Sequence, residues 1–396
     1  MNFNHVWIVF KKELLDLRRD KKTWIASVLI PILMIPLMFF LMGLGIGRID
    51  QVIEEATPVA IESKEEADVV KFLRKHPGFK VLEMQDTRKA LIEGEIMAII
   101  VVSENFQNNI EKQVAGNIKV LFDEVSSDSR ASASKVRNII EDYSESVMLK
   151  RLTALGINPD ILQPVLITRE AYIPEGANEK GVESMFMLSF MLPMFLLMYT
   201  VTGGMPVAID LGSGEKERMS LEPLLSTNAN RLSILAGKYL TILLAAAVGV
   251  LTSLFGLTIA GKVAGEVMPL EINLSLLQIG LIVVVTLLVA MIVSAVMLSL
   301  SIFARSYKEA GTYLSPLVVV IMIPNYIVMF TDVRTISTEW FLVPVLNSIL
   351  LIKEILFGII NPLNIFITVA VSVILVIASI FAAKYVFNKE SIIFRS

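Results

Sequence analysis

The chain has 396 residues, of which 55% are hydrophobic and 18% charged, whereas soluble globular proteins have about 45–50% apolar and about 25% charged residues. Its net charge of −3 provides no basic surface for nucleic acid. It contains no cysteine, which excludes disulfides, thiolate chemistry and cysteine-based metal sites. Because the apolar residues gather in long blocks, the composition indicates an α-helical polytopic membrane protein.

Residues 1–22 are predicted to form an amphipathic helix in the plane of the membrane interface. Apolar residues recur there at spacings of three and four, which is the period of one helix face. Six basic side chains against three acidic ones suit an anionic inner leaflet. The predicted apolar face comprises Trp7, Phe10, Leu14 and Leu17. Residues 23–47 follow as a first transmembrane helix, which lacks a small-residue cleavage site and is expected to be retained.

Residues 48–182 are more polar and are predicted to form an extracytoplasmic α/β domain between the first two spans. β-branched runs such as Ile96–Val102 alternate with helical patterns such as Ser126–Leu155, and this alternation is typical of an α/β fold. The segment contains no nucleophile-elbow, zinc-peptidase or clustered-histidine motif, so it offers no catalytic constellation. The other expected elements are strands 58–61, 79–84 and 118–122 and helices 64–75, 86–93 and 104–113.

Residues 183–396 contain five further apolar segments that are long enough to cross a bilayer core, which needs about 20 residues. Basic residues concentrate at the N-terminus, in the loop after the fourth span and in the C-terminal tail. The positive-inside rule therefore places both termini in the cytoplasm. The expected bounds of the five spans are 183–209, 232–260, 274–303, 312–330 and 362–387.

A shorter apolar stretch, residues 340–360, has two interpretations. It contains Lys353 and Glu354, and charged side chains are costly inside the hydrocarbon core. A seventh full span would also move the basic C-terminal tail outside, against the positive-inside rule. We therefore expect a re-entrant hairpin, with a full span as the alternative.

The polar interruption at residues 210–238 separates two of the long apolar segments. It combines charged residues with apolar ones at near-helical spacing. Residues 210–231 are therefore predicted to form a short helix across the membrane surface that contacts another protein. The alternative is that the acidic side chains only solvate the loop. The apolar set comprises Met219, Leu221, Leu224 and Leu225.

The chain lacks the sequence features of a self-powered transporter. No G-x-x-x-x-G-K-[ST] motif is present, so ATP cannot be bound in the P-loop manner. The middles of the spans are nearly free of the ionisable groups that an ion-coupled carrier would use. Active transport would therefore depend on ATP that is bound by another subunit.

Several segments together resemble the permeases of type 2 ABC exporters. Lys11–Thr23 resembles their elbow helix, Glu215–Lys238 is similar to their cytoplasmic coupling region, and Val343–Gly358 is similar to the hairpin before their last span. One span, a large outside domain and five spans follow in the same order. The chain departs at a turn where family members often have proline, because it has Asn228, although asparagine also suits turns. The layout is most similar to permeases of sodium-extruding pumps.

The resemblance implies a multi-pass permease of a bacterial or archaeal cell membrane that has no catalytic residue, cofactor or tightly bound metal of its own. Its partners would be the lipid bilayer, a second permease copy (the same chain or a related subunit) and an ABC ATPase dimer that binds ATP and Mg²⁺. The residues expected to couple to the ATPase are Glu215, Glu217, Met219, Leu221, Glu222, Leu224, Leu225, Arg231 and Lys238.

The resemblance favours Na⁺ as the cargo, and Na⁺ passage needs hard oxygen ligands. A second hypothesis is export of a hydrophobic peptide, antibiotic or lipid through a cleft beside the methionine-rich second span, although simple packing explains these methionines equally well. A third, remote hypothesis is a sensor or membrane enzyme that binds a ligand through the outside domain. The candidate ion-pathway residues are Glu183, Asn325, Asp332, Asn347 and Glu354.

Overall fold

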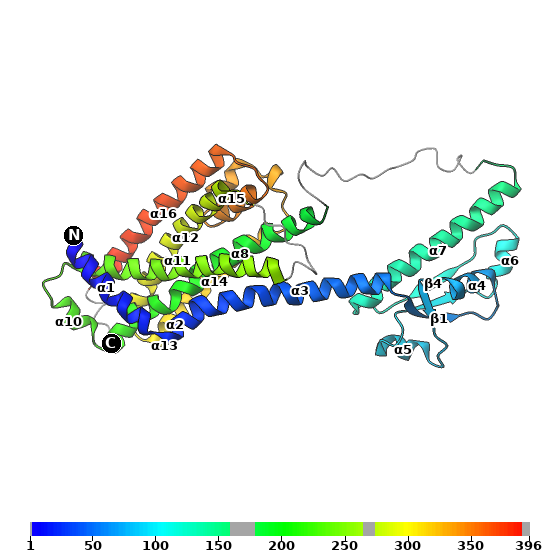
Figure 1. The fold of residues 1–396 in the computed structure, drawn as a ribbon, viewed down its shortest axis with the longest axis horizontal. Coiled ribbons are helices and arrows are strands. Elements are labelled where there is room, and N and C mark those ends of the chain that lie inside the picture. The colour runs from blue at the N-terminus through cyan, green and yellow to red at the C-terminus, as the bar shows by residue number, and fades with distance from the viewer. Residues whose placement is uncertain (1, 159–178, 264–273, 390–396) are drawn as a thin grey trace. The chain divides into compact units, whose positions relative to one another are not determined.

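The computed structural model describes residues 2–158, 179–263 and 274–389. The chain separates into two compact units, Met1–Leu41 with Ile173–Ser396, and Met42–Tyr172 (Figure 1). Within the described residues, six helical segments are long and apolar enough to cross a membrane, which is the predicted number. These segments are Ser27–Leu44, Met187–Glu217, Arg231–Val263, Leu276–Phe303, Tyr307–Ile327 and Pro362–Asn388.

The N-terminal segment begins with helix α1 (Phe3–Arg19), within the predicted range 1–22. Its buried residues are Val6, Val9 and Glu13, and α1 packs on α11 (Arg231–Val263). This is not the predicted apolar stripe, of which Trp7 is 55% exposed. An interfacial helix has two environments, and periodicity alone does not tell the protein-facing side from the lipid-facing one. The chain then continues through α2 (Lys21–Trp24), the π-helical turn η1 (Ile25–Leu29) and α3 (Ile30–Glu54).

The second unit is built on a four-stranded sheet in the order β2-β1-β3-β4. Strand β1 is parallel to β2 and β3, whereas β4 is antiparallel to β3. Strands and helices alternate in the predicted order. The strands are β1 (Thr57–Glu62), β2 (Phe79–Val81), β3 (Ala98–Val102) and β4 (Ile118–Leu121). The helices are α4 (Asp68–Lys75), α5 (Thr87–Glu93), α6 (Phe106–Glu111) and α7 (Ser127–Ala154).

Both faces of this sheet are buried, because successive strand residues point to opposite sides. Ile100 belongs to the larger core, which also holds Leu73 of α4 and Val136 of α7. Ile99 belongs to a smaller core with Ala90 of α5. The unbroken apolar run of β3 in the sequence thus reflects a strand that is covered on both faces. The position of this unit outside the cytoplasm stays a prediction.

The helical unit packs α8 (Glu179–Ile209) against α11 and α12 (Leu276–Phe303), and α12 against α16 (Pro362–Asn388). Helices α8 and α11 approach closely where Gly203 faces Gly249. A Cβ atom on Gly249 would lie 2.7 Å from the carbonyl oxygen of Tyr199. Small residues at such crossings let helix backbones meet inside a membrane. The fifth span consists of α13 (Tyr307–Leu314) and α14 (Pro316–Ile327).

The segment predicted as a re-entrant hairpin contains the short helix α15 (Leu346–Leu356), which follows two 3-10 turns, η4 (Val333–Thr335) and η5 (Thr338–Leu342). All 11 residues of α15 are buried. At 1.5 Å per residue, this helix is about 16 Å long, whereas a bilayer core is about 30 Å thick. The length of α15 therefore disfavours a full seventh span, and its re-entrant placement stays a prediction.

The glycine contact between α8 and α11 can be tested by substitution. We expect Gly249→Ala to destabilise the protein by about 1–3 kcal/mol, because backbone atoms must move to accept the added methyl group. The measurement is the apparent melting temperature in detergent. Gly280→Ala on α12 is the matched control, because its Cβ would meet nothing within 4 Å. Equal melting temperatures for the two variants would contradict the close packing.

Candidate functional site

The polar segment after α8 folds into two short helices. Helix α8 runs through a π-helical turn, η3 (Asp210–Gly214), into α9 (Glu215–Glu217), and α10 (Leu221–Leu225) follows before α11. The predicted single helix over 210–231 is therefore wrong. Met219 has a φ of 56°, and the N–H groups of Met219 and Ser220 donate to the carbonyls of Lys216 and Glu215. These bonds close the end of α9.

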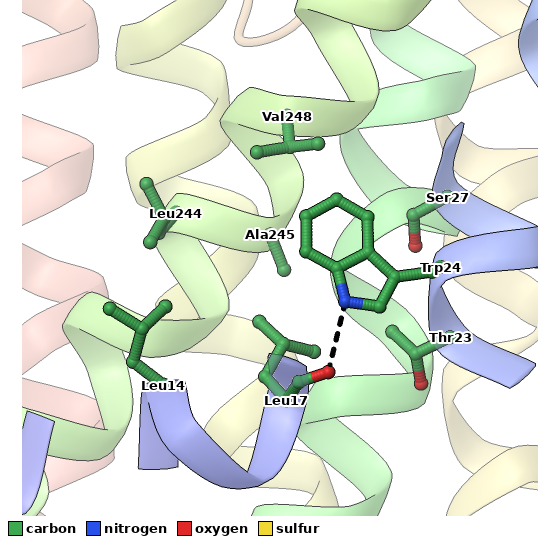
Figure 2. A pocket seen from close by; sticks show the side chains of 8 residues that line it. All are labelled: Leu14, Leu17, Thr23, Trp24, Ser27, Leu244, Ala245 and Val248. Atoms are coloured by element: carbon green, nitrogen blue, oxygen red, sulfur yellow. Dashed lines mark hydrogen bonds between the residues drawn. The ribbon is translucent and has the colours of Figure 1, made fainter. Parts of the chain in front are cut away.

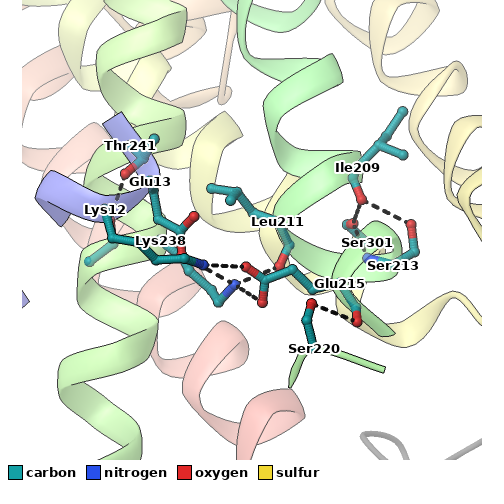
Figure 3. A network of polar contacts seen from close by, with 11 residues as sticks. Lys12, Glu13, Ile209, Leu211, Ser213, Glu215, Ser220, Lys238, Thr241 and Ser301 are labelled. Carbon is teal, nitrogen blue, oxygen red and sulfur yellow. Dashed lines mark hydrogen bonds and ion pairs between the residues drawn. The ribbon is translucent and has the colours of Figure 1, made fainter. Parts of the chain in front are cut away.

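An ionic network joins α9 to α11 and α1 (Figure 3), and three of its members, Glu13, Glu215 and Lys238, are buried, whereas the Lys12 side chain is 50% exposed. The Nζ atom of Lys238 lies 2.6 Å from a carboxylate oxygen of Glu215 and 3.8 Å from one of Glu13. Lys12 Nζ lies 3.1 Å from Glu13 and 3.3 Å from Glu215. Lys238 is 0% exposed and also donates to the carbonyl of Leu211 at 2.9 Å. Two bases and two acids balance, so the buried charges have partners.

The pKa values of Lys12 and Glu13, the two network residues on α1, are shifted by this environment. Burial raises the pKa of the Glu13 carboxyl, and the nearby Glu215 charge raises it further, while Lys238 and Lys12 oppose the shift. Burial acts to lower the pKa of Lys12, but the Glu215 and Glu13 carboxylates outweigh it, so this pKa lies above its ordinary value. Lys12 therefore stays charged at neutral pH and supports the acids of the network.

The same segment is also attached to α12 and α13. Lys216 Nζ donates to the carbonyls of Ile302 and Ala304, both at 3.0 Å, at the C-terminal end of α12. The Glu217 carboxylate accepts from the backbone N–H of Tyr307 at 2.9 Å, where a negative charge stabilises the N-terminus of α13. The segment therefore contacts α1, α11, α12 and α13, so a movement of α9 would act on several helices together.

The structure divides the predicted coupling residues into two groups. Glu215, Lys238 and Leu221 are buried inside the chain, so their side chains do not form the expected contact surface for another protein. The exposed or half-buried members are Glu217, Met219, Glu222, Leu224, Leu225 and Arg231. Sequence reasoning missed Glu13, although an acid on the same helix face as Val6 and Val9 is a signal of a buried partner.

The predicted ion-pathway residues do not form one cluster. Within the part of the chain that the structure describes, no hydrogen bond or ion pair joins any two of them. Asn325 is buried and donates to the carbonyl of Phe190 at 3.2 Å, whereas Asp332 is exposed and accepts from the N–H of Arg334. Glu183 lies in α8, but its side chain is outside the described residues.

The remaining two candidates lie on α15 and are buried. The Asn347 side-chain oxygen accepts from the N–H of Ser348 at 2.7 Å. The Glu354 carboxylate accepts from the side-chain amide of Asn364 on α16 at 2.7 Å. Asn364 was not predicted from the sequence. It lies in the first turn of the last apolar span, where a polar residue is common and does not indicate a binding site.

An apolar pocket lies where α1, α2 and η1 meet α11 (Figure 2). Trp24 is one of its lining residues, and its indole N–H donates to the carbonyl of Leu17 at 3.1 Å. The pocket is lined by Leu14, Leu17, Thr23, Trp24, Ser27, Leu244, Ala245 and Val248. Because no lining side chain is ionisable, the pocket offers neither a catalytic group nor a charged ligand for a cation. Leu14 and Leu17 of the predicted apolar face of α1 line this pocket.

Comparison with known proteins identifies relatives over almost the whole chain. A family model described as "ABC-2 family transporter protein" matches residues 21–383. The ABC transporter permease protein NatB of Bacillus subtilis (strain 168) is 29% identical over 394 residues, which cover 96% of this chain and 97% of the relative. No solved structure matches. The matched region includes the ionic network residues of α9 and α11, the hairpin segment and α16 up to residue 383.

The ionic network predicts a large effect of removing its central base. Lys238→Met leaves the buried acids Glu13 and Glu215 with Lys12 alone, and we expect a loss of about 3–5 kcal/mol of stability. The added change Glu215→Gln should recover part of this loss, because it removes one uncompensated charge. The measurement is the apparent melting temperature of the purified protein in detergent.

The control for this prediction is Arg218→Gln. Arg218 pairs with Asp210 at 2.6 Å, but its side chain is 65% exposed, and such a surface pair contributes about 0–1 kcal/mol. A melting temperature that falls equally in Lys238→Met and Arg218→Gln would contradict the structural role of the buried network.

Proposed function

We propose that this chain, which belongs to the ABC-2 family of transporter proteins and is the permease subunit of an ABC transporter, extrudes Na⁺ with energy from a separate ABC ATPase. The layout that resembles sodium-extruding permeases supports this cargo. The observation that carries it is Glu354, a carboxylate in the helical unit that is 4% exposed and has no ion-pair partner among the described residues. A buried acid without a counter-charge is a typical functional group in a membrane protein.

We propose that the ATPase contacts the surface formed by Met219, Glu222, Leu224 and Leu225, which we name the coupling surface. Met219 is 74% exposed, and such an apolar side chain beside half-buried leucines is available for burial in a groove of a partner. Closure of an ATPase dimer would displace α10 and α9. The ion pair of Glu215 and Lys238 would then carry the displacement into α11, and Glu13 would carry it into α1.

The assembly and orientation follow from the same proposal. Six spans with one coupling surface make half of a transporter, so two permease chains, identical or related, would pair with two-fold or pseudo-two-fold symmetry. Both termini and the coupling surface would lie in the cytoplasm, and residues 48–182 on the opposite side. ATP and Mg²⁺ would bind to the ATPase subunits alone.

Sodium transport can be measured directly in inverted membrane vesicles that contain this chain and the ABC ATPase encoded beside it. We expect ATP-dependent uptake of radiolabelled Na⁺ that persists when the proton gradient is collapsed, because the ATPase supplies the energy. Vesicles with an ATPase variant that cannot hydrolyse ATP are the control. Intact ATPase activity without Na⁺ uptake would contradict the proposed cargo and favour an apolar cargo beside the methionine-rich helix α8.

The coupling surface predicts a loss of affinity for the ATPase. Replacing Leu224 and Leu225 together by alanine removes apolar area from the contact, and we expect binding to weaken about tenfold or more. Co-purification and titration of the detergent-solubilised subunits measure the change. Ile92→Ala, which truncates a side chain of α5 that is 79% exposed, is the control. Unchanged binding of the double variant would show that the ATPase docks elsewhere.

A further inference from the structure

Two polar residues, Asn364 and Thr368, lie on the buried face of α16. Asn364 is 3% exposed and Thr368 is 0% exposed. They are four residues apart and therefore lie on the same side of the helix, one turn from each other. Polar side chains on a buried helix face are costly unless they have hydrogen-bond partners.

Glu354 on α15 contacts Asn364, the first of these two residues. Its Oε1 atom accepts from Asn364 Nδ2 at 2.7 Å. The adjacent Lys353 does not neutralise it, because Lys353 Nζ donates to the carbonyl of Val328 at 2.6 Å, at the end of α14. Across the described residues, Glu354 thus has one amide donor and no cationic partner.

Three oxygen atoms of this group are buried without a hydrogen-bond partner in the described part of the chain. They are Glu354 Oε2, Asn364 Oδ1 and Thr368 Oγ1. The threonine is informative, because buried threonines of other spans donate to the carbonyl four residues earlier, as Thr286 does to Ile282 at 2.7 Å. The Thr368 hydroxyl does not do so, and its oxygen is available to a ligand.

The chemistry of these atoms selects the ligand. A carboxylate, an amide oxygen and a hydroxyl are hard donors, which suit alkali and alkaline-earth cations and not soft metals. A single carboxylate balances one positive charge, so a monovalent ion leaves the buried site neutral. A proton would neutralise Glu354 and could be donated to one of the other two oxygens, but it would leave the remaining one without a partner.

We propose that Glu354, Asn364 and Thr368 form a binding site for one Na⁺ ion between α15 and α16. The proposal deepens the sodium-export function and rests on it for its physiological role, but the binding itself can be tested separately. Asn347, at the other end of α15, is not a ligand of this site. Its oxygen is already used by Ser348, and its free atom is Nδ2, a donor that repels a cation.

The test measures Na⁺ binding to the purified full-length permease in detergent, without the ATPase. The apparent melting temperature is followed while NaCl replaces choline chloride at constant ionic strength, and binding of radiolabelled Na⁺ is measured in parallel. We expect NaCl to raise the melting temperature in a saturable way. Thr368→Val removes one ligand oxygen at nearly constant volume and should raise the half-maximal Na⁺ concentration about tenfold or more.

Two further variants complete the set. Thr368→Ser keeps the hydroxyl and should rescue most of the response that Thr368→Val loses. Ser379→Ala is the control, because this buried hydroxyl of α16 already donates to the carbonyl of Val376 at 2.9 Å, and its Na⁺ response should equal that of the unaltered chain. Glu354→Gln should abolish the response.

The outcomes separate the site from the transport function. Saturable stabilisation by Na⁺ that depends on Thr368 and Glu354 supports the binding site. If vesicles then show no ATP-driven Na⁺ uptake, that result contradicts only the proposed cargo and not the site. Uptake with a half-maximal Na⁺ concentration that is the same in Thr368→Val and in the unaltered chain overturns the site and leaves the cargo standing. Stabilisation by low pH without any response to Na⁺ also overturns the site, because Glu354 then holds a proton.

Discussion

The ion pair between Lys238 and Glu215 is the interaction on which the packing of residues 210–238 depends. Both side chains are removed from water, so neither has solvent as an alternative partner, and breaking the pair exposes an uncompensated charge to the protein interior. The pair therefore fixes the position of α9 along α11. Glu13 and Lys12 extend this constraint to α1. The ion pairs therefore hold α1, α9 and α11 in fixed positions relative to one another.

Among the residues that the structure describes, the buried acids fall into two classes that differ in their charge compensation. Glu13 and Glu215 share two lysines and form a balanced structural contact. Glu354 has one amide donor within the described ranges. The same residue type thus stabilises the fold at one end of the helical unit and provides an unsatisfied charge at another. The distinction depends on which side chains meet across helices and not on the residue itself.

This dependence explains what the sequence could and could not predict. Long apolar runs and alternating strand patterns are local signals, so the six spans and the strand–helix order of the second unit follow from them. The pairing of Glu13 with Lys238 joins residues more than 200 positions apart, and no local pattern encodes it. The end of α9 at Met219 was hidden for another reason, because a left-handed helix end usually carries glycine.

The two ends of α12 connect residues 210–217 to Glu354, which has no cationic partner in the described part of the chain. At its C-terminal end, the carbonyl of Ile302 accepts from Lys216, and Ser301 accepts from the N–H of Ser213. At its N-terminal end, Gln278 donates to the carbonyl of Ile355, next to Glu354. A helix of 28 residues is about 42 Å long.

A continuous helix of this kind is stiff along its axis, and α16, which carries Asn364, packs against it. A displacement of α9 would therefore reach α15 and α16 through continuous contacts. It would act on the two helices that hold the unpaired oxygen atoms of Glu354 and Asn364, and a small shift between these helices would change the distance between those atoms. The geometry thus links the proposed coupling surface to the proposed cation ligands without any charged residue in the middle of α12.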